Sequence, residues 1–233
     1  MTSRVAELHF APTEKNRNAL LKEDIAEEKI HVTGNTVIDA LFCLSDDAMN
    51  SAKEFYQDKN IPVDDNVVLI TVHRRENHGE RLDRILDAIE TLVKKYSNHH
   101  FVLPVHPNPN VKDKVHCRLE KYSNVYLLKP LDYPYLVYLM KHAKLILTDS
   151  GGIQEEAPSF GCPTLVMRYE TERQEGINAG VSVLVGAEYD KIVSLSSEIL
   201  DKTRQDSRLQ AANPYGKGDS AKIIEGLIRE YFA

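Results

Sequence analysis

One stretch of the sequence, between residues 144 and 173, combines the residue types that a phosphate-binding turn needs. Ser150, Gly151 and Gly152 follow an apolar run and precede a run of good helix formers. Glycine has no Cβ, so a ligand can approach the backbone closely, and the first amides of a helix point outward without partners. The macrodipole adds about half a positive charge there, and the Ser150 hydroxyl can cap the helix or donate to a phosphate oxygen. The stretch predicts a site for an anionic ligand.

Two charged residues of the same stretch extend this interpretation. Glu156 lies about one and a half helical turns into the predicted helix, where its carboxylate could accept hydrogen bonds from a ribose diol. Arg173, beyond the next strand, could supply a bidentate positive clamp on a phosphate. The alternative is purely structural: Ser150 is an N-cap and the glycines allow close helix packing. A short glycine turn alone does not decide between the two.

Two further segments place histidine and arginine after predicted strands. The run Thr71 to Asn77 contains His73, Arg74 and Arg75, a plausible diphosphate site, and the alternative is a solvated charged loop. His106 lies between Pro104 and Pro107. A histidine in such a position more often stabilises a turn through its ring nitrogens than binds a ligand.

The elements that must position these residues alternate regularly between strand and helix. Residues 145–147 read as a buried strand, 153–157 as a helix that ends before Gly161 and Pro163, and 164–167 as the next strand, which together form a βαβ unit. Further strands are predicted at 67–72, 101–105, 125–128 and 181–185, and further helices at 79–96, 111–121, 133–142, 190–203 and 220–231. The fold class is therefore α/β, with a doubly wound, Rossmann-like parallel sheet covered on both faces. Ligands bind such sheets at the carboxyl ends of the strands.

The first part of the chain reads differently. Strands are predicted at 5–10 and 30–33, a helix from the Thr13 cap through Leu21, and one helix over residues 36–56. Because two strands cannot form a doubly wound domain, we expect residues 1–58 to be the remnant of a first α/β domain and its crossover. The segment 59–66, with Pro62, reads as a linker. Residues 59–233 are expected to form the ligand-binding domain with a C-terminal helix.

Composition excludes several other classes. The chain has 233 residues, 42% of them hydrophobic and 27% charged, with a net charge of −6, which argues against a nucleic-acid partner. Its three cysteines are widely spaced, so neither a disulfide framework nor a metal site is expected. No signal peptide or long apolar run is recognised, and we expect a cytoplasmic protein with no membrane partner. No GxGxxG opens a helix, which argues against a Rossmann dehydrogenase.

The longest motifs resemble those of the UDP-N-acetylglucosamine 2-epimerase family. Its signature Asp-Ser-Gly-Gly-x-Gln-Glu-Glu-Ala-Pro corresponds to residues 149–158, and Arg-x-x-Thr-Glu-Arg-Pro-Glu corresponds to residues 168–175. The family segment Thr-x-His-Arg-Arg-Glu-Asn corresponds to residues 71–77. Tyr169 stands where the family usually has Asp, and Gln174 where it usually has Pro. These departures concern the loop that carries Arg173.

The resemblance implies a role for each candidate residue. It implies that His73 is an active-site residue near the diphosphate, and that Ser150, Gly151, Gly152, Glu156 and Arg173 bind UDP. Uracil would lie against the backbone near Leu136, where the family usually has Phe. Arg74 and His106 match positions that contact a second, activating UDP-GlcNAc in some bacterial members.

The resemblance also implies the fold and reaction of the whole enzyme. The chain would be the C-terminal half of a two-domain, glycosyltransferase-B-like fold. The family interconverts UDP-GlcNAc and UDP-ManNAc by eliminating UDP and adding it back, without a cofactor or metal. The carboxylates that move the C2 proton lie in the first domain, which has no counterpart here. We therefore expect this chain to be inactive without a companion N-terminal domain, with UDP or UDP-GlcNAc as ligand and a homo-oligomer also possible.

Two alternatives remain open at this point. One is a non-catalytic UDP-sugar-binding remnant or sensor. The other is a fragment of a UDP-sugar glycosyltransferase, which shares the architecture, although the segments at 71–77 and 171–173 together fit the epimerases better.

Overall fold

The computed structural model describes residues 2–233, which form two compact units. Unit 2 comprises residues 45–212, and unit 1 comprises the residues up to 44 together with 213–233. Among residues 2–233, no helix combines the length and apolar composition of a membrane-spanning segment.

Unit 2 is built on a six-stranded sheet in which every neighbouring pair of strands is parallel. The strands are β3 (Val67–Thr71), β4 (His100–Pro104), β5 (Val125–Leu128), β6 (Leu145–Thr148), β7 (Thr164–Val166) and β8 (Ser182–Leu184). Their order is β5-β4-β3-β6-β7-β8. Strands β3, β4 and β5 are added in one direction along the sheet, and β6, β7 and β8 are added in the other direction from β3. The direction of winding therefore reverses between β3 and β6. This is the topological switch point at which doubly wound sheets bind ligands.

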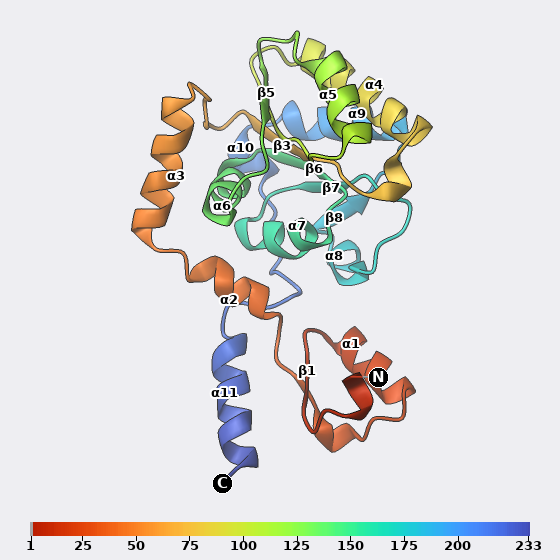
Figure 1. The fold of residues 1–233 in the computed structure, drawn as a ribbon, viewed down its shortest axis with the longest axis vertical. Helices are drawn as coiled ribbons and strands as arrows, with labels where there is room; N and C mark the ends of the chain where they lie inside the picture. Colours follow the sequence, from red (N-terminus) through yellow and green to blue (C-terminus); the bar gives the residue numbers. More distant parts are fainter. Residues whose placement is uncertain (1) are drawn as a thin grey trace. The chain divides into compact units, whose positions relative to one another are not determined.

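Helices cover both faces of this sheet (Figure 1), as the sequence predicts. On one face lie α4 (Glu80–Lys95), α5 (Pro109–Leu119) and α9 (Tyr189–Leu200), and on the other α6 (Tyr133–His142), α7 (Gly151–Glu156) and α8 (Gln174–Asn178). Unit 2 also contains α3 (Asp46–Asp58), α10 (Arg204–Ser207) and the short 3-10 turns Arg75–Asn77 and Ala157–Phe160. Helices α8 and α10 are not predicted from the sequence.

The core of unit 2 follows directly from the sequence pattern. The central strands β3 and β6 are continuous apolar runs because both of their faces are covered, and Val68, Ile70, Leu145 and Leu147 are fully buried. Helix α4 buries its stripe of Leu and Ile residues against them. Thr71 pairs with Thr148 in the register of β3 and β6, so the chain leaves both strands at the same height. This register places the segment after Val72 beside the Ser-Gly-Gly turn.

Unit 1 is much smaller. It contains the 3-10 turn Thr2–Arg4, β1 (His9–Ala11), α1 (Glu14–Lys22), the 3-10 turn Glu27–Lys29, β2 (Ile30–Val32), α2 (Thr36–Phe42) and α11 (Ser220–Tyr231). Strands β1 and β2 form a separate parallel pair. The Thr13 side chain caps α1 as predicted, by accepting from the Asn16 amide. Strand β1 is shorter than the predicted strand over residues 5–10.

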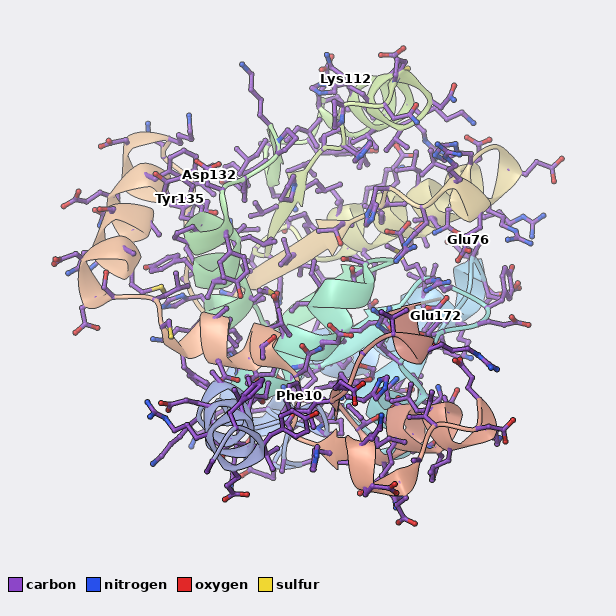
Figure 2. The ribbon with its side chains drawn as sticks, turned by 60° about the horizontal axis from the view of Figure 1, so that its bottom comes forward. Phe10, Glu76, Lys112, Asp132, Tyr135 and Glu172 are labelled. Atoms are coloured by element: carbon purple, nitrogen blue, oxygen red, sulfur yellow. The ribbon has the colours of Figure 1, made fainter. Side chains whose placement is uncertain are left out.

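The two units differ from the predicted division at residue 58 in two places. The predicted helix over 36–56 is two helices, because the Ser45 side chain caps a new helix, α3, by accepting from the Ala48 amide. Helix α3 then belongs to unit 2, where the Tyr56 hydroxyl donates to the Tyr135 carbonyl over 2.9 Å. Figure 2 labels Tyr135 in α6.

The last helix, α11, belongs to unit 1 and not to the ligand-binding domain of the predicted division. The Asp39 carboxylate in α2 accepts from the Ser220 and Ala221 amides and so anchors the first turn of α11.

Candidate functional site

A cleft of about 190 Å³ opens at the switch point of the unit 2 sheet. Its walls come from the carboxyl ends of β3, β4, β5 and β6 and from the helices that follow. The lining residues are Thr71, Val72, His73, Pro104, His106, Pro130, Leu131, Leu136, Ser150 and Ile153. Four of the residues proposed from the sequence, His73, His106, Leu136 and Ser150, therefore meet in one cleft.

The Asp149 carboxylate organises the loop on one side of this cleft. Asp149 directly follows β6 and is fully buried. It accepts from the backbone amides of His73, at 3.0 and 3.1 Å, and Arg74, at 2.9 Å. The Asn77 side-chain amide donates to it over 2.9 Å and also donates to the Met167 carbonyl. One carboxylate thus fixes the start of the His-Arg-Arg segment across the β3–β6 pair.

These donors keep Asp149 ionised in spite of its burial. Burial by itself raises the pKa of a carboxyl group, because it disfavours the charged form. Here the hydrogen bonds from the His73 ring and from the Arg74 and His73 amides outweigh burial and lower the pKa of Asp149 below its usual value of 3.8. Asp149 is therefore a buried, negatively charged acceptor at neutral pH.

The His73 ring lies between this carboxylate and the cleft. Its Nδ1 is 3.0 Å from Asp149 Oδ1, and the side chain is 36% exposed. The ring stacks on the ring of His106, with centroids 5.8 Å apart and an interplanar angle of 22°. The His106 Nδ1 accepts from the Asn108 amide over 3.2 Å. Two imidazoles thus face one another at the mouth of the cleft, each held by a different partner.

The Ser-Gly-Gly turn opens α7 and leaves room for a cation. A Cβ on Gly151 would lie 3.1 Å from Arg173 Cζ, so glycine at this position allows the guanidinium to lie against the first turn of α7. No atom lies within 4 Å of the Cβ position of Gly152, where the backbone is open to a ligand. Ser150 is the N-cap residue, but its side chain makes no cap hydrogen bond. The structure therefore does not bear out the capping role that was the structural alternative for this serine.

Arg173 is held in place by neighbouring carboxylates. Its Nε lies 3.0 Å from Glu155 Oε1, and one of its terminal nitrogens lies 3.4 Å from Glu172 Oε2. The Arg173 side chain is 31% exposed. An incoming phosphate would have to compete with Glu155 and Glu172 for this guanidinium.

Glu156, the last residue of α7, is buried and accepts from the Tyr133 hydroxyl over 3.1 Å. Burial raises the pKa of Glu156 to about 7, and the nearby Glu155 charge adds to this, while the Tyr133 hydrogen bond acts in the opposite direction. The group therefore changes between a hydrogen-bond donor and a pure acceptor near neutral pH.

A chain of ion pairs joins the His-Arg-Arg segment to the loop that carries Arg173. The buried Arg168 guanidinium contacts Glu76 at 2.6 Å and Glu172 at 3.0 Å, and Glu172 in turn contacts Arg173. Glu76 and Glu172 can be found in Figure 2, where both are labelled. These contacts fix the loop in which Tyr169 and Gln174 depart from the family pattern.

Of the remaining predicted residues, Arg74 contributes its backbone amide to Asp149. Its side chain is half-buried, and its Nε has no hydrogen-bond partner within residues 2–233. Glu156, the last residue of α7, and Arg173, which lies against its first turn, are outside the lining of the cleft. Within residues 2–233, no group of three or more His, Cys, Asp or Glu side chains is arranged to hold a metal ion.

Three site residues were not singled out from the sequence: Asp149, Asn77 and Tyr133. The signal for Asp149 was present, because an acidic residue directly after a fully apolar strand must lie at the sheet edge. Asn77 and Tyr133 could not be assigned, since their partners are 72 and 23 residues away in the chain.

The strand order, with a Ser-Gly-Gly turn at the switch point, defines a doubly wound, Rossmann-like α/β protein. The family model described as UDP-N-acetylglucosamine 2-epimerase matches residues 1–229. The chain therefore belongs to the UDP-N-acetylglucosamine 2-epimerase family, as the sequence motifs predicted.

Curated relatives and solved structures agree with this assignment. The UDP-N-acetylglucosamine 2-epimerase of Yersinia pestis is 46% identical over 236 residues, which cover 99% of this chain and 63% of that protein. The Escherichia coli K12 protein of the same name is 43% identical, with 97% and 62% covered. The crystal structure of the Neisseria meningitidis UDP-GlcNAc 2-epimerase bound to UDP-GlcNAc has a TM-score of 0.85 and 42% identity, over 98% of this chain and 63% of that one.

A solved structure of lower sequence identity has a similar fold. The Methanocaldococcus jannaschii UDP-GlcNAc 2-epimerase in complex with UDP-GlcNAc and UDP has a TM-score of 0.83 at 32% identity, over 97% of this chain and 62% of that one. The chain thus spans less than two thirds of the length of these relatives and corresponds to the C-terminal portion of their glycosyltransferase-B-like fold.

Proposed function

We propose that this chain is the nucleotide-binding portion of a UDP-N-acetylglucosamine 2-epimerase. With the N-terminal domain of the fold supplied, it would interconvert UDP-GlcNAc and UDP-ManNAc by eliminating UDP and adding it back. The main support is the arrangement at the switch point, where the buried Asp149 holds His73 next to the Ser-Gly-Gly turn. The choice of ligand is supported by the solved structures of the Neisseria meningitidis and Methanocaldococcus jannaschii relatives, which are complexes with UDP-GlcNAc and with UDP-GlcNAc and UDP.

Each part of UDP has a proposed partner. The open backbone at Gly152 and the uncommitted cap position of Ser150 would bind the diphosphate, with Arg173, which lies against Gly151, as the cation. Glu156 would accept from the ribose hydroxyls when ionised. Leu136, which lines the cleft, would lie near uracil, without the stacking that the Phe usual in the family provides.

His73 would act on the departing or returning UDP. Its ring lines the cleft and is held by Asp149, so it can receive or return a proton or stabilise the diphosphate when protonated. Arg74 and His106 remain candidates for contacts to a second nucleotide sugar, and the stacking of His106 on His73 would couple such a contact to the reacting site.

Nucleotide binding is the direct test of this proposal. Two to four charge-assisted hydrogen bonds, worth roughly 1.5–3 kcal/mol each before the cost of association, give an expected dissociation constant of roughly 0.1 to 1 mM for UDP. Calorimetry in EDTA and again with excess magnesium measures it, and equal affinity is expected in both. No heat at millimolar UDP, or heat only with magnesium, would count against the site.

A matched pair of variants tests the clamp. Arg173→Ala should weaken UDP binding by about 2 kcal/mol or roughly 30-fold, because a charge-assisted contact to phosphate is lost. Arg84→Ala removes an equally charged side chain from α4 that is 51% exposed and pairs only weakly, at 3.5 Å, with Glu80. It should leave the affinity unchanged. If both variants bind UDP alike, Arg173 is not a ligand.

Turnover distinguishes an epimerase portion from a UDP-sugar sensor. The cleft contains imidazoles on the nucleotide side only, whereas inversion at C2 needs groups that reach both faces of the sugar. Each missing acid or base costs about 10²–10⁴-fold, so the purified chain should show no measurable deuterium uptake at C2 in heavy water. Uptake should appear when the N-terminal part of a relative, such as the Yersinia pestis protein, is added. Full turnover by the chain alone would overturn this division.

A further inference from the structure

The hydrogen bonds around Asp149 have a consequence for the protonation of His73. Asp149 is fully buried and accepts from the backbone amides of His73 and Arg74 and from the Asn77 side chain. These three donors hold the plane of the carboxylate. Asp149 Oδ1 is thereby directed at the His73 ring, whose Nδ1 is 3.0 Å away. An ionised carboxylate can only accept hydrogen bonds, so the contact requires a proton on Nδ1.

A neutral imidazole carries one ring proton. If that proton is on Nδ1, Nε2 has a lone pair and is the only ring nitrogen able to take a proton. In free histidine the two nitrogens compete for the proton, and the partner of one nitrogen decides the outcome. Within residues 2–233 the ring of His106 stacks on His73 without offering such a partner, so the Asp149 carboxylate decides the position of the proton.

We propose that Asp149 is the positioning residue of this site, which fixes His73 in the tautomer with its proton on Nδ1 and its accepting nitrogen, Nε2, available in the cleft. Asp149 does not touch a ligand itself and acts only through His73. The consequence for catalysis rests on the proposed function: Nε2 would take a proton as a base, and the imidazolium that forms would keep its Nδ1–H bond to the buried anion. The tautomer itself does not depend on any activity.

The opposite arrangement at His106 provides an internal contrast. There Nδ1 accepts from the Asn108 amide, so the proton of the neutral ring must be on Nε2. The two stacked imidazoles are therefore expected in opposite tautomers, and both can be observed in one experiment.

Long-range ¹H–¹⁵N correlation spectra of the uniformly ¹⁵N-labelled full chain test the inference. At about pH 8.5, roughly two units above the ordinary histidine pKa, each neutral ring shows which nitrogen carries the proton. His73→Gln and His106→Gln spectra assign the two rings by their missing signals. The expected result is a proton on Nδ1 of His73 and on Nε2 of His106. A proton on Nε2 of His73 in the unmodified chain overturns the proposal, whether or not any variant folds.

Asp149→Asn supplies the second measurement. The Asn oxygen is expected to take the Oδ2 position, where it accepts from the Arg74 amide and the Asn77 side chain. Its NH₂ group then faces His73 Nδ1, which must become the acceptor, so the proton moves to Nε2. The same exchange beside a catalytic histidine in serine proteases leaves the geometry intact and gives the wrong tautomer.

Asn77→Ala is the matched control. It removes two hydrogen bonds from the same cluster, to Asp149 and to the Met167 carbonyl, but leaves the contact to the His73 ring. It should lower stability and keep the proton on Nδ1. If both variants move the proton, or neither does, Asp149 has only a structural role. UDP calorimetry is run on the same samples: a chain that binds no UDP but has the stated tautomer refutes the proposed function alone, and one that binds UDP with the proton on Nε2 refutes the positioning role alone.

Discussion

Unit 2 and unit 1 bury their apolar residues very differently. Unit 2 has six parallel strands with helices on both faces, and its central strands are fully buried. Unit 1 has one pair of three-residue parallel strands, which by itself is too small to form a stable sheet. Most of the large hydrophobic side chains that are exposed within residues 2–233 belong to unit 1: Val5, Val32, Phe42, Ile223, Ile228, Tyr231 and Phe232.

The candidate site lies in unit 2, whereas most of the exposed apolar surface lies in unit 1. Every residue that lines the cleft lies in unit 2, and so do Asp149, Glu156 and Arg173. In α11, by contrast, only Ser220 is buried, although the helix has a clear apolar face. An apolar face of this kind needs a cover, and we expect the chain to self-associate unless the N-terminal domain of the fold provides it.

The largest effect that we expect is a difference in backbone amide hydrogen exchange between unit 2 and unit 1. Backbone amides in β3 and β6 should exchange at least about a thousandfold more slowly than those in β1 and β2, because the core strands open only with the whole unit. Exchange followed by mass spectrometry on the full chain at low protein concentration measures both regions in one sample.

Addition of an N-terminal domain from a relative, such as the Yersinia pestis protein, sharpens the same test. If that domain covers unit 1, protection should rise in β1, β2 and α11 and change little in β3 and β6. Equal protection of the two units in the chain alone would refute the contrast.

The long periodic elements were predictable from the sequence. The predicted bounds of α6 and α11 agree with the structure, because an apolar period of 3.6 residues can be recognised over ten or twelve residues. The short helices α8 and α10 were missed, since four or five residues do not establish a period. The break in the predicted helix at residues 36–56 was missed although Ser45 precedes two acidic residues, a usual start signal.

For the site, the sequence identified the segments but not how they interact. Residues such as His73 and Ser150 could be proposed because their types and their place after strands suggested a ligand. The contact between Asp149 and His73 could not be predicted from the sequence, because it spans 76 residues and depends on the register of β3 with β6. The pairing of Arg173 with Glu155 likewise depends on the path of the loop after β7.

A matched pair of isoleucines measures the contrast in packing. Ile85 in α4 is fully buried, whereas Ile228 in α11 is 38% exposed. Ile85→Ala should lower the free energy of unfolding by about 2–5 kcal/mol, because it removes buried methyl groups and leaves a cavity. Ile228→Ala should cost less than about 1 kcal/mol. Urea unfolding followed by circular dichroism gives both values, and similar losses in the two variants would mean that α11 is as well packed as α4.

The smallest effect that we expect lies inside unit 2, where the buried carboxyl group of Glu156 lowers the free energy of unfolding. Burial raises the pKa of Glu156 from 4.5 to about 7. Between these two pH values the folded chain keeps a proton that the unfolded chain has lost, so the free energy of unfolding falls as the pH rises. Above about pH 7 the carboxylate is charged in both states and the whole cost, roughly 3 kcal/mol for such a shift, is present.

Glu156→Gln removes this cost, because glutamine stays neutral and its oxygen can still accept from Tyr133. At pH 8 the variant should be more stable than the unmodified chain by about 1–3 kcal/mol, and the difference should shrink toward pH 5. Urea midpoints at pH 5, 6.5 and 8 measure it, with Glu198→Gln on the exposed face of α9 as the control that should change little at any of them. If Gln at position 156 is destabilising at every pH, the carboxylate contributes more to the fold than its burial costs. A stabilising effect at pH 8 would instead mean that unit 2 retains a buried acid for its ligand and not for its own packing.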